Sequence, residues 1–550
     1  MPESKLDDPP RMPRQIRYII ANEGCERFSF YGMRNILTPF LLTFLLVDIP
    51  DGDERKLASK AVFHTFVMGV YFCPLIGGWI ADRLFGKYNT ILWFSLIYCV
   101  GHGCLAMFED SKGGFYTGLF LIALGSGGIK PLVAAFMGDQ FDSRNKHLAK
   151  AVFDAFYWII NFGSFFASLL MPAFLISFGP SVAFGIPGAL MFIATVALWI
   201  GRKTYVMVPV APANPNSFMR VVWTALTTPN ARGSSPGRLI AIIGCVLAVA
   251  SFGLLFWIEI VPVICLALVI VMAFGGIGTS MQLENARGKH SDTAVDGVRA
   301  VLSILIVFAL VTPFHSLFDQ KATEWVHQGG LMDIPAWDVS LGFLGEWETN
   351  FSPAQMQAFN PMLVMLLIPF NNFVLYPWLR KRGWEATSLR RMTLGILFGG
   401  IAWVVIGIIQ LKIEAGTDKI TILWQVLPYA VLTFGEVLVL ATGLEFAYSQ
   451  APLAMKGVIM SFWNLTTTVG QLWVILGDHT IRGKAVTSTL DDYGISQTAF
   501  FMFFFAGFAF AACIAFKIYT RRYKMLDNYR EAGPPGAGGD PLPKATARDR

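Results

Sequence analysis

The sequence predicts an all-α protein that crosses a membrane many times. Of its 550 residues, 54% are hydrophobic and only 15% are charged, whereas about 25% are charged in an average soluble domain. Apolar runs close to the roughly 20 residues that a spanning helix needs recur along the chain. Lys and Arg gather in short clusters between these runs. These observations exclude soluble, disordered and fibrous proteins, and no basic face that would bind nucleic acid is visible.

The apolar runs predict fourteen membrane helices. The first run is interrupted by the charges of Glu23, Glu26, Arg27 and Arg34, so its assignment as a helix rests on the charge pattern of the loops. The predicted helices occupy residues 20–48, 59–82, 90–108, 114–138, 150–176, 182–205, 238–258, 260–281, 299–322, 355–379, 391–412, 419–447, 454–476 and 497–520.

Loop charges predict the topology, because Lys and Arg gather on the cytoplasmic side of a membrane. With the N-terminus inside, the acidic residues fall in outer loops, and the stretch 324–354 contains no Lys or Arg. Both termini are therefore expected in the cytoplasm, and the number of helices is even. The basic residues expected inside are Arg83, Lys87, Arg144, Lys146, Lys150, Arg202, Lys203, Arg220, Arg380, Lys381, Arg382, Arg390, Arg391, Arg521, Arg522 and Lys524.

The middle of the chain separates six helices from six. Residues 207–237 are rich in Pro, Asn, Ser and Gly and are typical of a cytoplasmic linker, and the two helices at 238–281 return the chain to the same side. Two six-helix bundles predict a site between them near the membrane midplane. The expected parts are a cytoplasmic tail at 1–19, an N-terminal bundle at 20–206, a linker with two additional helices at 207–298, a C-terminal bundle at 299–522 and a disordered tail at 523–550.

The first helix carries a charged stripe. Glu23, Arg27, Tyr31 and Arg34 follow one another in steps of four, four and three residues, so they share one helix face, which Glu26 flanks. A charged side chain at the centre of a membrane helix costs about 2.5–3.5 kcal/mol on insertion scales. The stripe therefore cannot face lipid. It is either a structural ladder of salt bridges or the wall of a cavity that binds charge and moves protons, and we favour the cavity.

Two further helices carry isolated charges. Lys130 lies in the segment Gly125 to Pro131 with no carboxylate nearby in sequence, so its partner must come from another helix. A buried lysine can act as a switchable charge, and Lys130 is expected to do so while it is also the countercharge to Glu23 or Glu26. Glu436 lies alone in an apolar stretch, which makes it a candidate functional residue.

Histidines offer a second route for protons, because histidine titrates near neutrality. His64 and Asp319 fall near the outer ends of the second and seventh core helices. A proton shared between them would change the attraction between the bundles, although a membrane histidine is often only a hydrogen-bonded structural residue. His102 and His315 are weaker candidates.

No cofactor or metal is expected. Seven cysteines are scattered along the chain without a CxxC pair, so neither a disulfide framework nor a metal site is predicted. The first fifteen residues hold no apolar core, and we expect no cleavable signal peptide.

The loop Gly78 to Lys87 is short, glycine-rich and basic. It resembles the G-x-x-x-D-R-x-x-G-K loop of the major facilitator superfamily, although any loop on the cytoplasmic side can be basic. The resemblance implies a gating role for Asp82 and Arg83.

Several motifs together resemble the proton-dependent oligopeptide transporters, a family of the major facilitator superfamily. The segment Asn22 to Gly32 is similar to the family's E-x-x-E-R-F-x-Y-Y signature. The resemblance runs from about Glu23 to Phe462, and fourteen helices fit its bacterial members. The other matching segments, in the expected order, are Gly127 to Pro131, Gly138 to Phe141, Phe156 to Ser164, Phe318 to Gln320, Asn360 to Pro361, Gly435 to Val437 and Met455 to Gly457.

The resemblance implies a symporter in the bacterial inner membrane that imports di- and tripeptides with protons by alternating access. Carried over by position, the peptide carboxylate would face Arg27, Arg34 and Lys130. The amino terminus would be held by Asn161, Asn360 and Glu436. Side-chain pockets and the rest of the substrate site would involve Tyr31, Tyr71, Tyr157 and Trp463. Proton coupling would use Glu23, Glu26, Arg27 and Lys130, with His64 and Asp319.

Three departures from the family pattern concern specificity rather than activity, because none removes a charge. Phe30 replaces the first tyrosine of the Y-Y pair. Leu440 and Ala441 stand where the family often has Ser-Pro, and His315 occupies a position often held by Trp.

The residues themselves agree with a peptide substrate, since a zwitterion needs a cationic and an anionic pole some distance apart. The alternatives are another solute, a membrane-embedded hydrolase or a receptor that no longer transports. A nitrate carrier would not need Glu436, and a sugar carrier would want fewer buried charges. A hydrolase would need a nucleophile and base, yet neither HExxH nor GxSxG at a strand–helix turn is visible. A receptor could lose the coupling carboxylates, which are all present.

Overall fold

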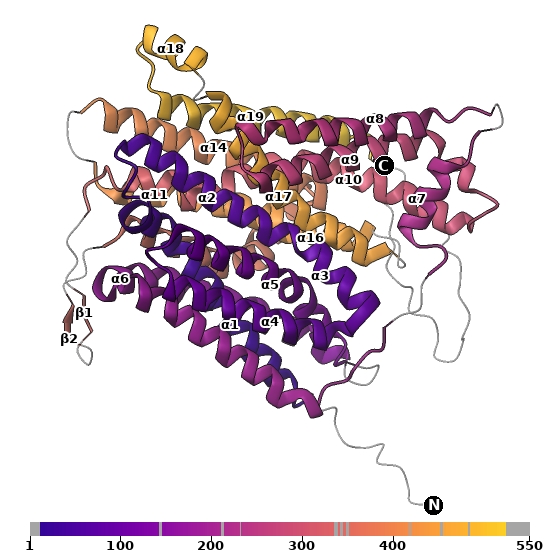
Figure 1. The fold of residues 1–550 in the computed structure, drawn as a ribbon, viewed down its shortest axis with the longest axis horizontal. Coiled ribbons are helices and arrows are strands. Elements are labelled where there is room, and N and C mark those ends of the chain that lie inside the picture. Colours follow the sequence, from indigo (N-terminus) through magenta and orange to yellow (C-terminus); the bar gives the residue numbers. More distant parts are fainter. Residues whose placement is uncertain are drawn as a thin grey trace, which may run out of the picture.

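The computed structural model describes residues 12–141, 146–210, 214–230, 233–334, 339–341, 345–347, 351–416, 420–450, 455–481 and 484–523. Most of them belong to long helices that run side by side (Figure 1). One end of these helices carries Asp48, Asp51 and the short pair β1–β2, and we call it the acidic end. The opposite end carries Arg83 and the helix α7, and we call it the basic end.

The first six predicted helices are present. The helix α6 is broken at Gly179, whose φ of +81° favours glycine; because Pro180 fits the first turn of a helix, a second helix restarts there. The elements are α1 Ile16–Phe40, η1 Leu41–Leu45, α2 Gly52–Phe72, α3 Pro74–Ile80, η2 Ala81–Phe85, α4 Gly86–Met107, α5 Lys112–Gly138, α6 Lys146–Ile200 and η3 Gly201–Lys203.

The middle segment holds more structure than its composition predicts. Within the expected linker, α7 (Phe218–Thr227) is a helix whose Phe218, Val221 and Ala225 are buried against the C-terminal core. Apolar residues three and four apart form this buried face. The additional helices form a hairpin from α8 (Pro236–Ala250) and η4 (Ser251–Phe256) to α9 (Ile260–Gln282), followed by η5 (Leu283–Ala286).

The last part begins with α10 and ends with α19. Its β1 and β2 pair antiparallel at the acidic end. The elements are α10 Asp292–Asp319, η6 Gln320–Ala322, α11 Glu324–Gly329, β1 Val339–Leu341, β2 Gly345–Trp347, η7 Pro353–Ala358, α12 Phe359–Phe370, η8 Asn371–Leu375, α13 Tyr376–Lys381, α14 Ser388–Glu414, η9 Ile422–Gln425, α15 Val426–Glu436, η10 Val437–Ala441, α16 Thr442–Gln450, α17 Lys456–Ile481, α18 Lys484–Asp492 and α19 Gln497–Thr520.

The prediction of fourteen membrane helices is confirmed. In the described part of the chain, eleven helical spans are long and apolar enough to cross a membrane. Two of these, Gly52–Met107 and Ala155–Lys203, each contain two of the predicted helices. The helix α1 adds the last one, because its charged residues exclude it from a count by hydropathy.

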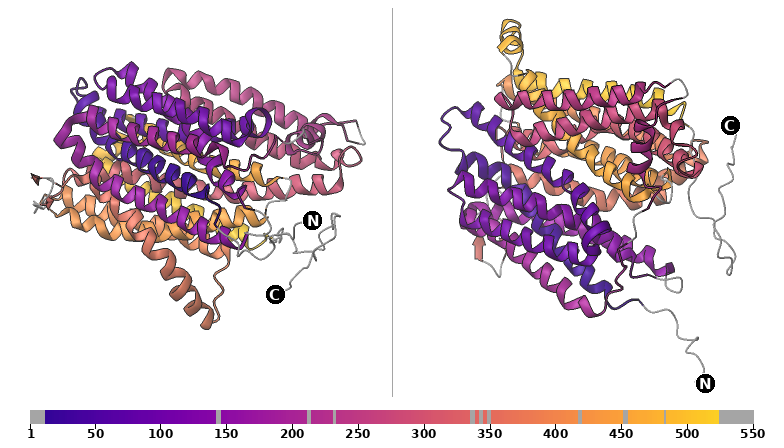
Figure 2. Two further views of the ribbon diagram at one scale, coloured as in Figure 1. Left: turned by 90° about the horizontal axis from the view of Figure 1, so that it is seen from below. Right: turned by 45° about the vertical axis from the view of Figure 1, so that its right-hand side comes forward.

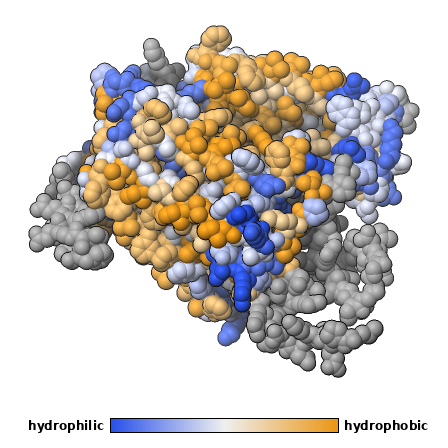
Figure 3. Space-filling model, turned by 60° about the horizontal axis from the view of Figure 1, so that its bottom comes forward, coloured by the Kyte–Doolittle hydropathy of each residue, from blue (hydrophilic) through white to orange (hydrophobic). Residues whose placement is uncertain are grey.

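Two large hydrophobic cores divide the described part of the molecule, and a small third cluster of Met68, Cys265, Leu472 and Ile475 joins α2, α9 and α17. The first collects residues from Ile16 to Tyr205, together with Ala322, and the second collects residues from Phe218 to Phe516. Figure 2 shows the corresponding groups of helices as two packed bodies, from which the segment Pro353–Lys381 extends. Figure 3 shows an apolar surface with hydrophilic residues gathered mostly toward its margins. Such a surface fits a molecule whose sides face lipid.

Candidate functional site

The charged stripe of α1 forms a buried cluster around one guanidinium. Arg27 Nε lies 2.6 Å from Glu23 Oε1 and 3.0 Å from Glu26 Oε2. Both glutamates are at most 1% exposed, and Arg27 is 9% exposed. Two carboxylates therefore share one cation within the same helix, as the sequence spacing allows, and the cluster carries one excess negative charge.

Lys130 lies against aromatic rings instead of carboxylates. Its Nζ is 3.4 Å from the ring centroid of Phe30 and 4.7 Å from that of Tyr71. No ion pair of the described residues includes Lys130, because Arg27 occupies both carboxylates. Lys130 still lies close enough to Glu23 and Glu26 to interact with their charges, so its expected role as their countercharge stays a prediction. Phe30, which stands where the family has a tyrosine, presents the face of its ring to the ammonium group of Lys130. Such a cation–π contact becomes stronger where water is excluded.

The opposite pole belongs to the C-terminal core and contains a residue that the sequence did not reveal. Asn360 donates through Nδ2 to the Glu436 carboxylate and, at 3.0 Å, to Thr433 Oγ1. The Asn360 Oδ1 atom accepts a hydrogen bond of 2.8 Å from Lys321 Nζ. Glu436 is therefore not alone. Lys321 directly follows the Phe318 to Gln320 motif, but a lysine at the end of a helix is ordinary and gave no signal.

Arg34 connects the two bundles. Its guanidinium binds the carboxylate of Asp319, and both side chains are less than 9% exposed. Gln471 donates through Nε2 to Asp319 Oδ2 at 2.5 Å, and its Oε1 lies 2.5 Å from His64 Nδ1. His64 and Asp319 are thus joined through Gln471 rather than paired directly. His64 Nε2 also lies 3.2 Å from Thr323 Oγ1.

A second group of ionic contacts lies nearby at the acidic end. Lys60, which is fully buried, binds the carboxylate of Glu324 and lies 2.7 Å from Asp478 Oδ1. Thr38 Oγ1 donates to the carbonyl oxygen of Ala322 at 2.8 Å. These contacts join α1 and α2 to the C-terminal helices. The buried Lys60 was missed because it lies in the first turns of its helix, where a charge is expected to reach water.

The remaining predicted residues are divided between the two bundles. Tyr31 lies close enough to Arg27, Arg34 and Glu436 to be influenced by all three charges. Asn161 Nδ2 donates to its own helix at the Tyr157 carbonyl, 3.0 Å away.

In the C-terminal bundle, the ring of Trp463 packs edge-to-face against that of Phe308, with ring centroids 5.2 Å apart. The ring centroid of His315 lies 6.1 Å from that of Trp463. His315 Nε2 shares a hydrogen bond of 2.9 Å with Thr466 Oγ1, and His315 Nδ1 shares one of 3.3 Å with Thr467 Oγ1. His102 lies 3.0 Å from Ser29 Oγ inside the first core, as a structural histidine would.

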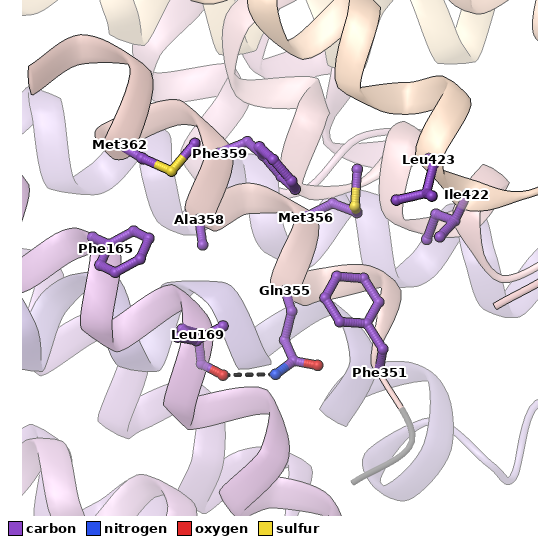
Figure 4. Close-up of a pocket in the computed structure, with 10 residues that line it drawn as sticks. All are labelled: Phe165, Leu169, Phe351, Gln355, Met356, Ala358, Phe359, Met362, Ile422 and Leu423. Atoms are coloured by element: carbon purple, nitrogen blue, oxygen red, sulfur yellow. Dashed lines mark hydrogen bonds between the residues drawn. The ribbon is translucent and has the colours of Figure 1, made fainter. Parts of the chain in front are cut away.

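An apolar cavity of about 120 Å³ separates α6 from η7 and α12. Figure 4 shows Phe165 and Leu169 on one side of it and Phe359 and Met362 on the other. At one edge, Gln355 Nε2 donates to the Leu169 carbonyl oxygen at 2.7 Å, so a hydrogen bond links the bundles here too.

The predicted gating residues lie at the basic end. Asp82 and Arg83 are exposed in the π-helical turn η2. In the same loop region, Lys87 Nζ lies 2.6 Å from Asp139 Oδ2 and ties α4 to the end of α5.

The family model described as PTR2, POT family, matches residues 88–482. Peptide transporter 3 of Caenorhabditis elegans is 31% identical over 419 residues, which cover 73% of this chain and 51% of that protein. Solute carrier family 15 member 2 of Homo sapiens is 31% identical over 420 residues, covering 73% and 49%. The chain spans about half the length of these curated relatives.

A solved structure matches over nearly the whole chain. The crystal structure of an auto inhibited POT family peptide transporter is similar with a TM-score of 0.90 and 60% identity, covering 94% of this chain and 99% of that chain.

Proposed function

This chain belongs to the POT family, and from that premise we propose that it is a proton-coupled symporter that imports di- and tripeptides by alternating access. The resemblance seen in its motifs is thereby confirmed at the level of the family. The matched relatives are named as transporters and not as enzymes, which removes the ground for a membrane-embedded hydrolase.

One observation carries the proposal: charges of opposite sign reach one region from different bundles, since Arg27, Arg34 and Glu436 all lie near Tyr31. The cationic pole consists of Lys130, Arg27 and Arg34 of the N-terminal bundle. The anionic pole is Glu436 of the C-terminal bundle, held by Asn360, which also binds Lys321. A dipeptide zwitterion has the matching carboxylate and ammonium groups. A peptide that binds both poles would draw the bundles together, because its binding energy is realised only when both contacts form.

Arg34 would change partners during this cycle. Its guanidinium binds Asp319 across the bundles in the substrate-free molecule, whereas the proposal also gives it a peptide carboxylate. A proton on Asp319 would weaken that pair and free Arg34. His64, joined to Asp319 through Gln471, would then supply a route for the proton from the acidic end.

Glu23 and Glu26 would form the second part of proton coupling. Their shared Arg27 leaves one negative charge uncompensated in a buried cluster. Uptake of one proton would neutralise that charge, which lowers the cost of burying it away from water. The cluster of Glu23, Glu26 and Arg27 is therefore suited to a transport step that depends on protonation.

The polar contacts between bundles support the direction of opening. The side-chain contacts between the bundles lie toward the acidic end, and they are made by Arg34, Lys60, Thr38 and His64. These contacts support a molecule that is closed at the acidic end. Asp82 and Arg83 would act as gating residues at the basic end. We place both termini and the basic end in the cytoplasm, in a bacterial inner membrane, with bundles at 20–206 and 299–522.

The test is uptake of radiolabelled dialanine into liposomes that contain the purified protein. An inward proton gradient should concentrate dialanine inside, and a protonophore should abolish the concentration. A nitrate or sugar carrier would leave dialanine at equilibrium with or without the gradient, and a receptor would bind it without uptake.

A further inference from the structure

A second cavity, of about 400 Å³, lies at the acidic end, apart from the two poles. Small-molecule sites are commonly clefts of roughly 300–1,000 Å³ with apolar walls and a few placed polar groups. Its walls come from α2 of the N-terminal bundle, from the turn that joins η4 to α9, and from α17. The additional hairpin therefore contributes a wall to a space that lies outside the two poles, with His64 of the proposed proton route in its α2 wall.

The titratable side chains that line this cavity are three carboxylates, one lysine and two histidines, namely Glu54, Glu259, Asp478, Lys60, His64 and His479. Lys60 and Asp478 are buried in its wall and bind each other. At its rim, Glu54 and Glu259 are exposed, and no ion pair of the described residues gives either of them a cation. Glu259 Oε2 accepts only a long hydrogen bond of 3.4 Å from Thr65 Oγ1. Two carboxylates are thus available to a positive ligand.

The rest of the lining is apolar. Trp257 and Ile258 extend from the hairpin turn, and Ile475 faces them from α17. Trp257 is 71% exposed, so its ring is open to a ligand. An inorganic cation would gain nothing from these side chains, whereas an organic cation would bury its apolar body against them.

We propose that this cavity binds a small amphiphilic ammonium ion. Its ammonium group lies between Glu54 and Glu259, and its apolar body packs against Trp257, Ile258 and Ile475.

Binding is coupled to the conformation of the acidic end. The cavity exists because α2 meets α9 and α17, and the Lys60–Asp478 ion pair joins two of these walls. Separation of the bundles at this end would take the walls apart. A ligand that binds one conformation better shifts the population toward it. The ammonium ion therefore holds the acidic end closed and slows transport without competing with peptide.

The binding test uses radiolabelled phenethylammonium and the full-length protein in nanodiscs of phosphatidylglycerol, with saturating dialanine present. We expect saturable binding, and none of comparable affinity for neutral 2-phenylethanol. Each rim carboxylate contributes at most about fivefold in affinity, the equivalent of about 1 kcal/mol for a partly exposed pair. Glu54→Gln with Glu259→Gln should therefore weaken binding by up to about 25-fold. Glu445→Gln, an exposed carboxylate on α16, should leave it unchanged.

Two further measurements sharpen this test. In nanodiscs that contain phosphatidylethanolamine, a fall in apparent affinity would assign the ammonium to a lipid headgroup, and an unchanged affinity would assign it to a free amine. In uptake assays, phenethylammonium should lower the maximal rate with KM unchanged. That second assay rests on the proposed transport function, whereas the binding assay does not. The proposal is overturned by displacement of the probe by dialanine, by equal binding of the alcohol, or by full affinity in the double variant.

Discussion

Neutralising Glu436 should remove the anionic pole while leaving the shape of the site intact. In Glu436→Gln, the amide replaces the carboxylate that accepts from Asn360. Asn360 still binds Lys321 Nζ at 2.8 Å, but the cation of Lys321 then lacks its negative neighbour. A peptide ammonium entering this region would meet the Lys321 cation without the compensating carboxylate, so the affinity falls selectively for ligands with a free ammonium group.

The size of the loss follows from the burial of this pole. Removing one partner of a desolvated charge pair costs about 2–5 kcal/mol. Glu436 and Asn360 are only half-buried, so the lower part of that range applies. A loss of about 2–3 kcal/mol corresponds to a roughly 30- to 150-fold weaker affinity for dialanine, at 1.4 kcal/mol per tenfold.

The assay is competition against labelled dialanine, with dialanine and N-acetyl-dialanine as competitors. Only dialanine, which has a free ammonium, should lose affinity in Glu436→Gln. Glu445→Gln is the matched control, because Glu445 lies nine residues further on and pairs with Arg391 at 2.9 Å outside the site. Unchanged dialanine affinity in Glu436→Gln, or an equal loss of affinity for the acetylated peptide, would show that Glu436 does not bind the peptide ammonium.

Three further outcomes are expected. Glu23→Gln or Glu26→Gln should stop proton-driven accumulation and spare exchange of dialanine across a symmetric membrane, because exchange needs no proton; continued accumulation by both variants would contradict this role. His64→Ala should flatten the pH dependence of uptake while dialanine affinity changes less, and a wild-type pH profile at normal expression would leave α1 as the coupling site. At the start of α2, the backbone N–H groups of Glu54 and Asp53 hold the pKa of Asp51 below its usual value. A carboxyl group whose pKa is depressed in the folded state stabilises the fold at pH values above its ordinary pKa. The stabilisation is lost as the pH falls through the folded-state pKa. Thermal unfolding of Asp51→Ala should therefore begin earlier than in the wild type near neutral pH, and the difference should vanish in acid; a difference that persists in acid would show that the carboxylate is not its cause.

The fold was predictable because its signals are periodic and local. A helix that crosses a membrane needs one long apolar run, and thirteen of the fourteen helices have one. The stripe of α1 was predictable for the opposite reason, since charges spaced four residues apart on such a helix must be buried together. Both inferences use only residues that are neighbours along the chain.

The partners between helices were not predictable in the same way. Spacing places Arg34 on a face, but nothing in the sequence states that Asp319, 285 residues later, will bind it. Lys321 directly follows the end of α10, and Lys60 stands at the start of the apolar run 59–82. At both places a lysine is expected to reach water. Gln471 carries no charge and gave no signal, although it connects His64 with Asp319.

Leu440 and Ala441 illustrate a limit of motif comparison. They depart from the expected Ser-Pro, and they lie in η10, a π-helical turn that directly follows Glu436. A turn of this kind changes the direction in which following side chains point, and such turns are frequent at functional sites. The sequence predicted an effect on specificity there, but a regular apolar run could not reveal the turn itself.

In the proposed mechanism, peptide and protons move together through one carrier. Coupled movement is measured directly by following the pH inside liposomes with a trapped dye, at symmetric starting pH and with the membrane potential clamped, while dialanine is added outside. We expect that dialanine acidifies the interior, that the signal saturates with dialanine concentration, and that Glu23→Gln or Glu26→Gln abolishes it. Uptake of labelled dialanine at the normal rate without any acidification would show that peptide moves without protons.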